Sequence, residues 1–132
     1  MTTTVQPRLI VTDVDAAVAF YGEVFGARET FRATVPPGDP EGAVVHCVLA
    51  IGPNALTLAE ANDDYRLYAP RKLGGSPVLL TATVADAYAI GTAIESRGGR
   101  VVVPIEDRDY GKREGRLEDP FGHLWVVSQT LS

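Results

Sequence analysis

Apolar side chains recur at helical spacing soon after the start of the chain, at Val14, Val18, Tyr21, Val24 and Phe25. This spacing places them on one face of a helix. Asp13 or Asp15 lies where it can cap this helix, because a carboxylate accepts hydrogen bonds from the free amides of the first turn. Gly26 follows the pattern and permits the left-handed residue at which many helices end. Residues 8–12 before the helix are predicted to form a short strand.

Three extended segments follow this helix. Residues 28–35 are predicted to form a strand that leads into a loop rich in proline and glycine, Pro36 to Gly42. Residues 43–51 and 55–60 are predicted to pair as a hairpin around Gly52-Pro53-Asn54. With the first strand and helix, these segments make one βαβββ module.

The second half of the chain repeats this order. Asp13 and Asp86 are 73 residues apart, and Gly26 and Gly98 are 72 residues apart, a period too long for a solenoid repeat. The repeat predicts a second module of the same kind. Its elements are a strand over 77–84, a helix over 87–97, a strand over 99–104, and a hairpin of 114–119 and 123–129 joined by the turn Asp119-Pro-Phe-Gly122.

Two similar modules predict an α+β fold in which a duplicated unit curves around a shared cavity. The 132 residues suit one domain with its own hydrophobic core. We expect modules over about 5–60 and 77–130, joined by a polar linker over 61–76. This linker contains Tyr65 and Tyr68, which a simple tether would not need.

Charge and composition exclude several classes of protein. The net charge is −5, and no basic stripe is long enough to follow a phosphate backbone, so we expect no nucleic-acid partner. No apolar run approaches a membrane span, and the first residues lack the features of a signal peptide, which predicts a cytoplasmic protein. Cys47 is the only cysteine and lies in an apolar run, which predicts a buried structural thiol.

Several motifs follow one another along nearly the whole chain. They are Val11-Thr-Asp13, Ala19-Phe-Tyr21 and Val24-Phe-Gly-Ala27, Leu73-Gly-Gly-Ser-Pro77, Val84-Ala-Asp86, Tyr110-Gly-Lys-Arg113 and Asp119-Pro-Phe-Gly-His-Leu-Trp125. In this order they resemble the vicinal oxygen chelate superfamily, which includes glyoxalase I, fosfomycin-resistance enzymes, extradiol dioxygenases and bleomycin-resistance proteins. The branch that the chain resembles includes the phosphonate-operon protein and drug-binding resistance proteins. The resemblance implies two βαβββ modules that form a cupped mixed sheet, commonly completed by a homodimer.

The family's metalloenzymes hold a divalent metal through four positions, filled by His, Glu or occasionally Gln. In this chain the four positions fall on Gln6, Thr57, Thr81 and Val126, with Glu60 in place of Thr57 if the register shifts. Valine has no donor atom, and threonine hydroxyls are poor ligands beside imidazole or carboxylate. The resemblance therefore implies that this chain lacks the family's metal site and needs no cofactor.

The chain has two histidines. His46 could join an atypical metal shell with Gln6, or act with Glu60 as an acid–base pair, because a nearby carboxylate raises the basicity of an imidazole. The favoured interpretation is simpler: His46 is an ordinary polar residue on a strand face, and Glu60 is a solvated strand end. His123 follows a turn and is expected to face solvent. No phosphate loop, dinucleotide fingerprint or nucleophile elbow is present.

Aromatic residues offer a different kind of site. Tyr110 and Arg113 match an aromatic-Gly-x-Arg element of the drug-binding relatives, in which the ring would stack on a flat ligand. Alternatively, Tyr110 would pack this loop against its own sheet. Phe31, with the linker tyrosines 65 and 68, could rim the cavity or lie on the surface. Trp125 is expected in the core. The acidic net charge suits a protein that attracts cationic ligands, and it is also ordinary for a soluble domain.

These features predict a metal-independent protein that binds a small molecule. We expect it to sequester an aromatic or polycyclic natural product, as in antibiotic self-resistance, in a cleft at a homodimer interface. The ligand residues would be Gln6, Phe31, His46, Thr57, Tyr65, Tyr68, Thr81, Tyr110, Arg113 and Val126. The alternatives are an isomerase, lyase or atypical metalloenzyme of the same superfamily, and an interaction module whose cup is filled by its own side chains.

Overall fold

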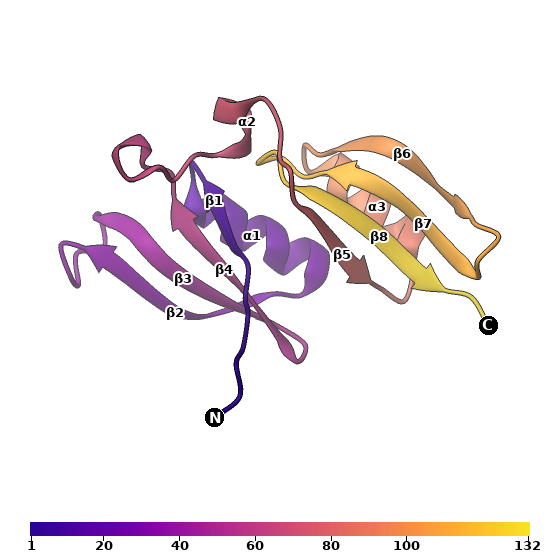
Figure 1. The fold of residues 1–132 in the computed structure, drawn as a ribbon, viewed down its shortest axis with the longest axis horizontal. Helices are drawn as coiled ribbons and strands as arrows, with labels where there is room; N and C mark the ends of the chain where they lie inside the picture. Colours follow the sequence, from indigo (N-terminus) through magenta and orange to yellow (C-terminus); the bar gives the residue numbers. More distant parts are fainter. The chain divides into compact units, whose positions relative to one another are not determined.

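The chain folds as two compact units in a computed structural model that describes residues 1–132. Unit 1 is Met1–Ala69 and unit 2 is Pro70–Ser132 (Figure 1). Each unit contains one four-stranded mixed sheet and one main helix, in the order βαβββ. The predicted α+β class and the repeated module are therefore confirmed.

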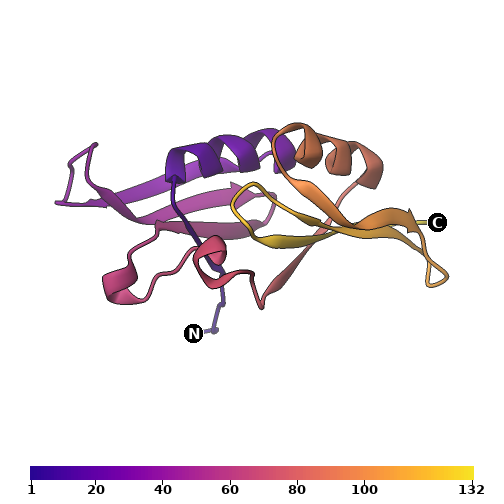
Figure 2. The same cartoon turned by 90° about the horizontal axis from the view of Figure 1, so that it is seen from above.

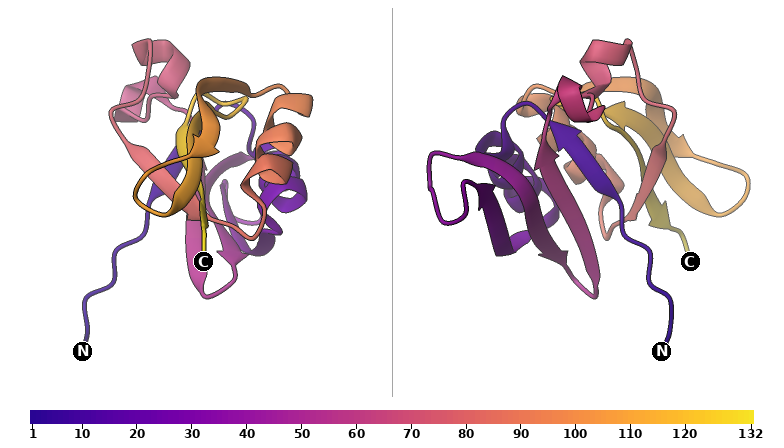
Figure 3. Two further views of the ribbon diagram at one scale, coloured as in Figure 1. Left: turned by 90° about the vertical axis from the view of Figure 1, so that its right-hand side faces the viewer. Right: turned by 60° about the vertical axis from the view of Figure 1, so that its left-hand side comes forward.

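In unit 1 the first strand lies beside the last one. The sheet has the order β1-β4-β3-β2, in which β1 runs parallel to β4 and the other pairs are antiparallel (Figure 3, right). A short 3-10 turn, η1 (Asp63–Tyr65), follows the last strand. The elements are β1 (Arg8–Val11), α1 (Val14–Phe25), β2 (Arg28–Val35), β3 (Ala43–Ile51) and β4 (Asn54–Glu60).

Unit 2 repeats this topology. Its sheet has the order β5-β8-β7-β6, with β5 parallel to β8. None of the helices has the length and apolar character that crossing a membrane requires. The elements are α2 (Pro70–Leu73), β5 (Leu79–Thr83), α3 (Ala87–Ser96), β6 (Arg100–Asp107), β7 (Lys112–Glu118) and β8 (Leu124–Thr130).

The two main helices begin in the same way. The Asp13 side chain accepts a hydrogen bond from the Ala16 amide at 3.0 Å, and Asp86 accepts one from Ala89 at 3.1 Å. Both aspartates therefore satisfy an amide that the helix leaves free. Gly26 ends α1 with φ 72°. The structure thus selects Asp13 as the cap of α1.

Each helix covers only one face of its own sheet (Figure 2). Alternate strand residues point toward the helix and are buried, because successive side chains of a strand point to opposite faces. The fully buried side chains on these covered faces include Val11, Cys47, Leu49 and Leu58 in unit 1 and Leu117 and Val127 in unit 2.

The opposite face of each sheet, which we call the open face, is not covered by the helix of its own unit. One row of paired residues crosses each open face. In unit 1 the row is Arg8, Thr57, Val48 and Phe31. In unit 2 it is Thr81, Val126, Arg116 and Val103.

Two parts of the fold differ from the sequence prediction. The segment over 61–76 contains η1 and α2, and Pro70 in α2 lies against Gly122 so closely that a Cβ added to that glycine would be 2.9 Å from the proline Cβ. Strand β6 continues past Pro104, where the prediction ended it. The strand tolerates this proline because it lies at the sheet edge and contains register shifts.

Asp119 organises the turn between β7 and β8. Its side chain is 1% exposed and accepts hydrogen bonds from the amides of Phe121 and His123 and from Trp125 Nε1, at 2.9, 3.0 and 2.9 Å. The prediction that Trp125 lies in the core is confirmed. The prediction that His123 faces solvent is wrong: the residue is 8% exposed, because this turn folds inward around the aspartate.

We expect Asp119→Asn to destabilise the protein by about 2 kcal/mol. The asparagine NH2 group would face the Trp125 N–H, and two donors would then meet without an acceptor between them. In a Trp125→Phe background the same substitution should cost much less, since the opposing donor is gone. Urea unfolding followed by far-UV circular dichroism measures both costs. Equal costs in the two backgrounds would show that the Asp119–Trp125 hydrogen bond contributes nothing.

Cys47 lies on the covered face of unit 1 and is fully buried and unpaired, as predicted. Burial is the main cause that raises the pKa of its thiol to about 11, and the negative charge of Glu29 adds to the shift. Since a raised pKa leaves less reactive thiolate at neutral pH, the folded chain protects this cysteine.

Alkylation of Cys47 by iodoacetamide near pH 8 should therefore be slowed roughly a hundredfold or more in the folded chain relative to the chain in urea. The ionisation difference alone accounts for that factor, and steric protection adds to it. Mass spectrometry of timed samples gives the two rates. Similar rates in the two conditions would mean that unit 1 exposes the thiol.

Candidate ligand-binding site

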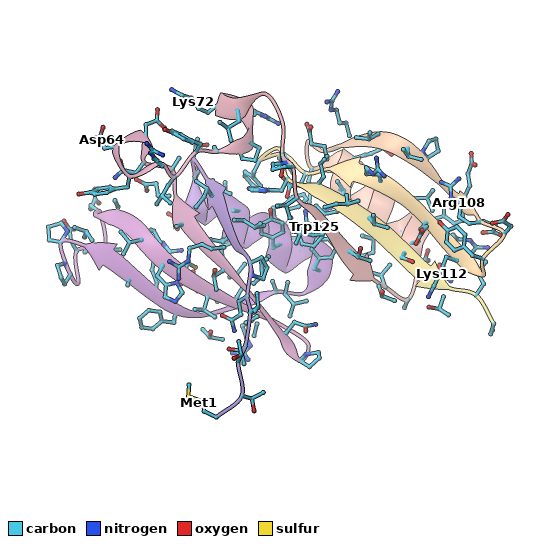
Figure 4. The ribbon with its side chains drawn as sticks, in the orientation of Figure 1. Met1, Asp64, Lys72, Arg108, Lys112 and Trp125 are labelled. Carbon is cyan, nitrogen blue, oxygen red and sulfur yellow. The ribbon has the colours of Figure 1, made fainter.

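The open face of unit 2 contains a pocket of about 250 Å³. Strands β6, β7 and β8 supply its lining, and the β6–β7 loop closes one end, near Arg108 and Lys112 in Figure 4. The pocket combines apolar side chains with charged ones. The lining residues are Val103, Arg108, Tyr110, Glu114, Gly115, Arg116 and Val126.

A glycine allows β6 and β7 to come close together beside this pocket. A Cβ added to Gly115 would lie 2.5 Å from the Val103 carbonyl oxygen and 2.6 Å from the Ile105 nitrogen. These are backbone atoms of an irregular part of β6, so they cannot move aside as a flexible side chain would. Gly115 therefore fixes the shape of the pocket wall.

Arg108 is held at the pocket by backbone oxygens. Its guanidinium donates to the Pro104 carbonyl at 2.6 Å and to the Glu114 carbonyl at 2.8 and 3.1 Å. The Glu106 carboxylate lies 3.4 Å away. With most of its donors engaged, Arg108 is a fixed structural cation of the β6–β7 hairpin.

Tyr110 and Glu114 act as a pair. The Tyr110 hydroxyl donates to Glu114 Oε1. This hydrogen bond is the main cause that lowers the pKa of Glu114, with contributions from Ser128 and Arg108, and it raises the pKa of Tyr110. Both groups therefore keep their neutral-pH forms, a phenol and a carboxylate. The hydroxyl is anchored while the tyrosine remains 61% exposed, which leaves its ring available for stacking.

Arg113, the predicted partner of Tyr110, points to the other face of the sheet. Its Nε lies 2.6 Å from Asp107 Oδ1, and its guanidinium lies over the Tyr88 ring of α3, 5.0 Å from the ring centre. The ion pair lowers the pKa of Asp107 and raises that of Arg113. The structure therefore brings Tyr110 and Val126 together in the pocket and leaves Arg113 out of it.

The alternation of side chains along β7 explains which charged residues lie in the pocket in place of Arg113. Because β7 begins at Lys112, residues 114 and 116 share the open face, whereas 113, 115 and 117 point the other way. The sequence prediction missed Arg108, Glu114 and Arg116. Had the predicted strand begun directly after Gly111, the same alternation would have placed Glu114 and Arg116 on the open face.

The open face of unit 1 presents a second polar cluster. Arg8 Nη2 lies 2.7 Å from His46 Nδ1, and Arg8 Nε lies 3.4 Å from Thr57 Oγ1. A guanidinium can only donate, so His46 Nδ1 accepts and the ring proton of neutral His46 is on Nε2. The ring of Phe31 lies 5.7 Å from the imidazole. Thr57, His46 and Phe31, all predicted ligand residues, therefore come together here.

Glu60 lies away from this cluster. It lines a cavity of about 420 Å³ at the N-terminus of α1, together with Asp13, Asp15 and Arg32. This cavity is on the covered side of the sheet, opposite His46. The predicted acid–base pair of His46 and Glu60 is therefore wrong, and Thr57 rather than Glu60 faces the open side.

The remaining predicted residues are spread over the chain. Gln6 lies before β1 and is exposed, and Thr81 is exposed on β5 beside Val126. Tyr65 lies in η1 and is exposed, and Tyr68 follows that turn and is half-buried. Both tyrosines lie outside the sheet of unit 1.

A divalent metal does not fit Thr57 or Val126, two of the positions that the resemblance assigns to metal ligands. Thr57 Oγ1 already donates to the Pro7 carbonyl at 2.8 Å, and the positive charge of Arg8 lies next to it. Val126 offers no donor atom. Within either unit, no three His, Cys, Asp or Glu side chains lie close enough together to hold a metal ion.

Two proteins of known sequence are similar to this chain over nearly its whole length. Two uncharacterized proteins, from Mycobacterium tuberculosis and Mycobacterium bovis, are each 37% identical to this chain over 131 aligned residues. The alignments cover 95% of this chain, and 73% and 82% of those proteins respectively. Neither name states an activity.

Solved structures show the same fold at low sequence identity. TioX from Micromonospora sp. ML1 is 24% identical with a TM-score of 0.67, and the match covers 98% of each chain. An Arabidopsis thaliana gene product is 23% identical with a TM-score of 0.72, over 97% of this chain and 99% of the other. The fosfomycin resistance protein FosX from Listeria monocytogenes, solved with Mn(II) and sulfate, is 15% identical with a TM-score of 0.70, over 98% and 91%.

A family model matches nearly the whole chain. The model described as "Glyoxalase/Bleomycin resistance protein/Dioxygenase superfamily" matches residues 3–127, which include all of both modules except the end of β8. The resemblance expected from the sequence motifs is confirmed. The chain belongs to the glyoxalase/bleomycin resistance protein/dioxygenase superfamily.

Proposed function

We propose that this protein is a metal-independent binder that sequesters an aromatic or polycyclic natural product. The observation that carries the proposal is the unit 2 pocket, in which the anchored ring of Tyr110 stands beside Val103 and Val126. Sequestration requires affinity without turnover, and burial of apolar surface with ring stacking supplies it. A family whose name includes bleomycin resistance proteins is consistent with this role.

The pocket alone is too small for a polycyclic ligand. Its volume of about 250 Å³ holds one or two rings, whereas sites for drug-sized molecules start near roughly 300 Å³. A polycyclic ligand needs additional surface. We assign that surface to a second copy of the chain, so that the complete cleft lies at a homodimer interface.

Two other functions are less well supported. An isomerase or lyase built on His46 and Glu60 lacks its acid–base pair, because the two side chains lie on opposite faces of the sheet. An interaction module with a filled cup would leave no space on the open face of unit 2. The pocket there is open and lined by an exposed aromatic ring.

Calorimetric titration with a panel of DNA-damaging and polyketide antibiotics tests the proposal. At least one planar compound should bind, and Tyr110→Ala should weaken it about tenfold through lost stacking and apolar contact. Tyr88→Ala is the matched control, because Tyr88 is similarly exposed but lies on α3, outside the pocket. Absence of heat from every compound, or equal losses in the two variants, would contradict the proposed site.

Metal independence has its own test. After removal of metals with a chelator, titration with nickel, zinc and manganese should give no stoichiometric binding, because Arg8 places a positive charge beside Thr57 and His46. Elemental mass spectrometry of the purified protein should likewise find no bound equivalent. One tightly bound equivalent, lost in Gln6→Ala, would instead establish an atypical metal site.

A further inference from the structure

Arg116 is a positive charge without a partner at the centre of an open sheet. It lies on β7, and its neighbours in register are Val126 on β8 and Val103 on β6. The side chain is exposed and lines the unit 2 pocket. No hydrogen bond or ion pair engages its guanidinium. Apolar side chains therefore flank a full set of free N–H donors.

The other charges of the pocket are already engaged. Arg108 donates to the carbonyls of Pro104 and Glu114, and Glu106 lies beside it. The Glu114 carboxylate accepts from Tyr110 and is also hydrogen-bonded to Ser128. Two arginines and one glutamate line the pocket, so its lining carries an excess positive charge even though the chain is acidic. Arg116 is the cation that remains free for a ligand.

We propose that Arg116 binds the carboxylate of a planar aromatic ligand in this pocket. A guanidinium presents parallel N–H donors that match the two oxygens of a carboxylate. Val103 and Val126 on either side suit the flat apolar body, and the Tyr110 ring is available to stack on it. The inference rests on the proposed binding function and specifies the chemistry of its ligand.

The pocket favours a single negative charge over a dianion. Glu114 lines the same pocket and repels each added negative charge on the ligand. A carboxylate carries one charge, whereas a phosphate monoester carries nearly two near neutral pH. The pocket volume of about 250 Å³ sets the size of the ligand, and two fused rings with a carboxylate suit it.

The test compares 2-naphthoate with 2-naphthamide, its neutral counterpart of similar shape. Nitrogen-15-labelled full-length protein is titrated with each compound at neutral pH, and the amide signals of Gly115 and Val126 report on the pocket. We expect naphthoate to bind at least about tenfold more tightly, the ratio typical of a hydrogen bond to a charged group.

Two variants, each of which removes one positive charge, test whether the preference for naphthoate depends on Arg116. Arg116→Gln should abolish the preference for naphthoate and leave naphthamide binding unchanged. Arg71→Gln removes an exposed arginine of α2, outside this pocket, and should keep the preference. Circular dichroism confirms that each variant is folded.

The outcomes separate this inference from the proposed function. If both compounds bind with equal affinity and shift the pocket signals, the carboxylate role of Arg116 is refuted while aromatic binding stands. Equal loss of preference in the two arginine variants also refutes it, because a general charge effect would then explain the result. No signal change up to the solubility of naphthoate overturns the inference, whereas the antibiotic panel tests aromatic binding separately.

Discussion

A four-stranded sheet covered by a single helix can bury only one of its faces, and this constraint determines the role of almost every strand residue. Alternate positions must be apolar to pack under the helix, as Leu58 and Leu117 do. The positions between them are free of the helix and can carry polar and charged groups, as His46 and Arg116 do. A shift of one residue in any strand would exchange the two sets.

The open faces carry arginines beside two of the positions at which the family resemblance would place metal ligands. In unit 1, Arg8 is hydrogen-bonded to His46 and lies beside Thr57, one of those positions. In unit 2, Arg116 stands next to Val126, another of those positions. Guanidinium groups bind the anionic and carbonyl parts of organic molecules, not cations. The net charge of −5 gives no indication of this, because a net charge averages over the whole surface.

Local patterns in the sequence were sufficient to predict the module. The aspartates before α1 and α3, the glycines after them and the core position of Trp125 depend on neighbours within a few residues. The burial of His123 was not predictable in this way, since it depends on how one carboxylate folds the turn around itself. The pocket was found only in part. Tyr110 and Val126 were identified, whereas Arg108 depends on the irregular course of β6, which involves hydrogen bonds to carbonyls four and six residues away in sequence.

The single cysteine and the single tryptophan fall in different halves of the duplicated fold. Cys47 is buried in unit 1, and Trp125 is buried in unit 2. Each half therefore carries its own natural reporter, one chemical and one fluorescent, without any engineered label. If the halves unfold as one cooperative block, thiol exposure and tryptophan emission will change at the same denaturant concentration. If one half opens first, the midpoints and slopes of the two transitions together will give the free energy by which the duplicated modules differ.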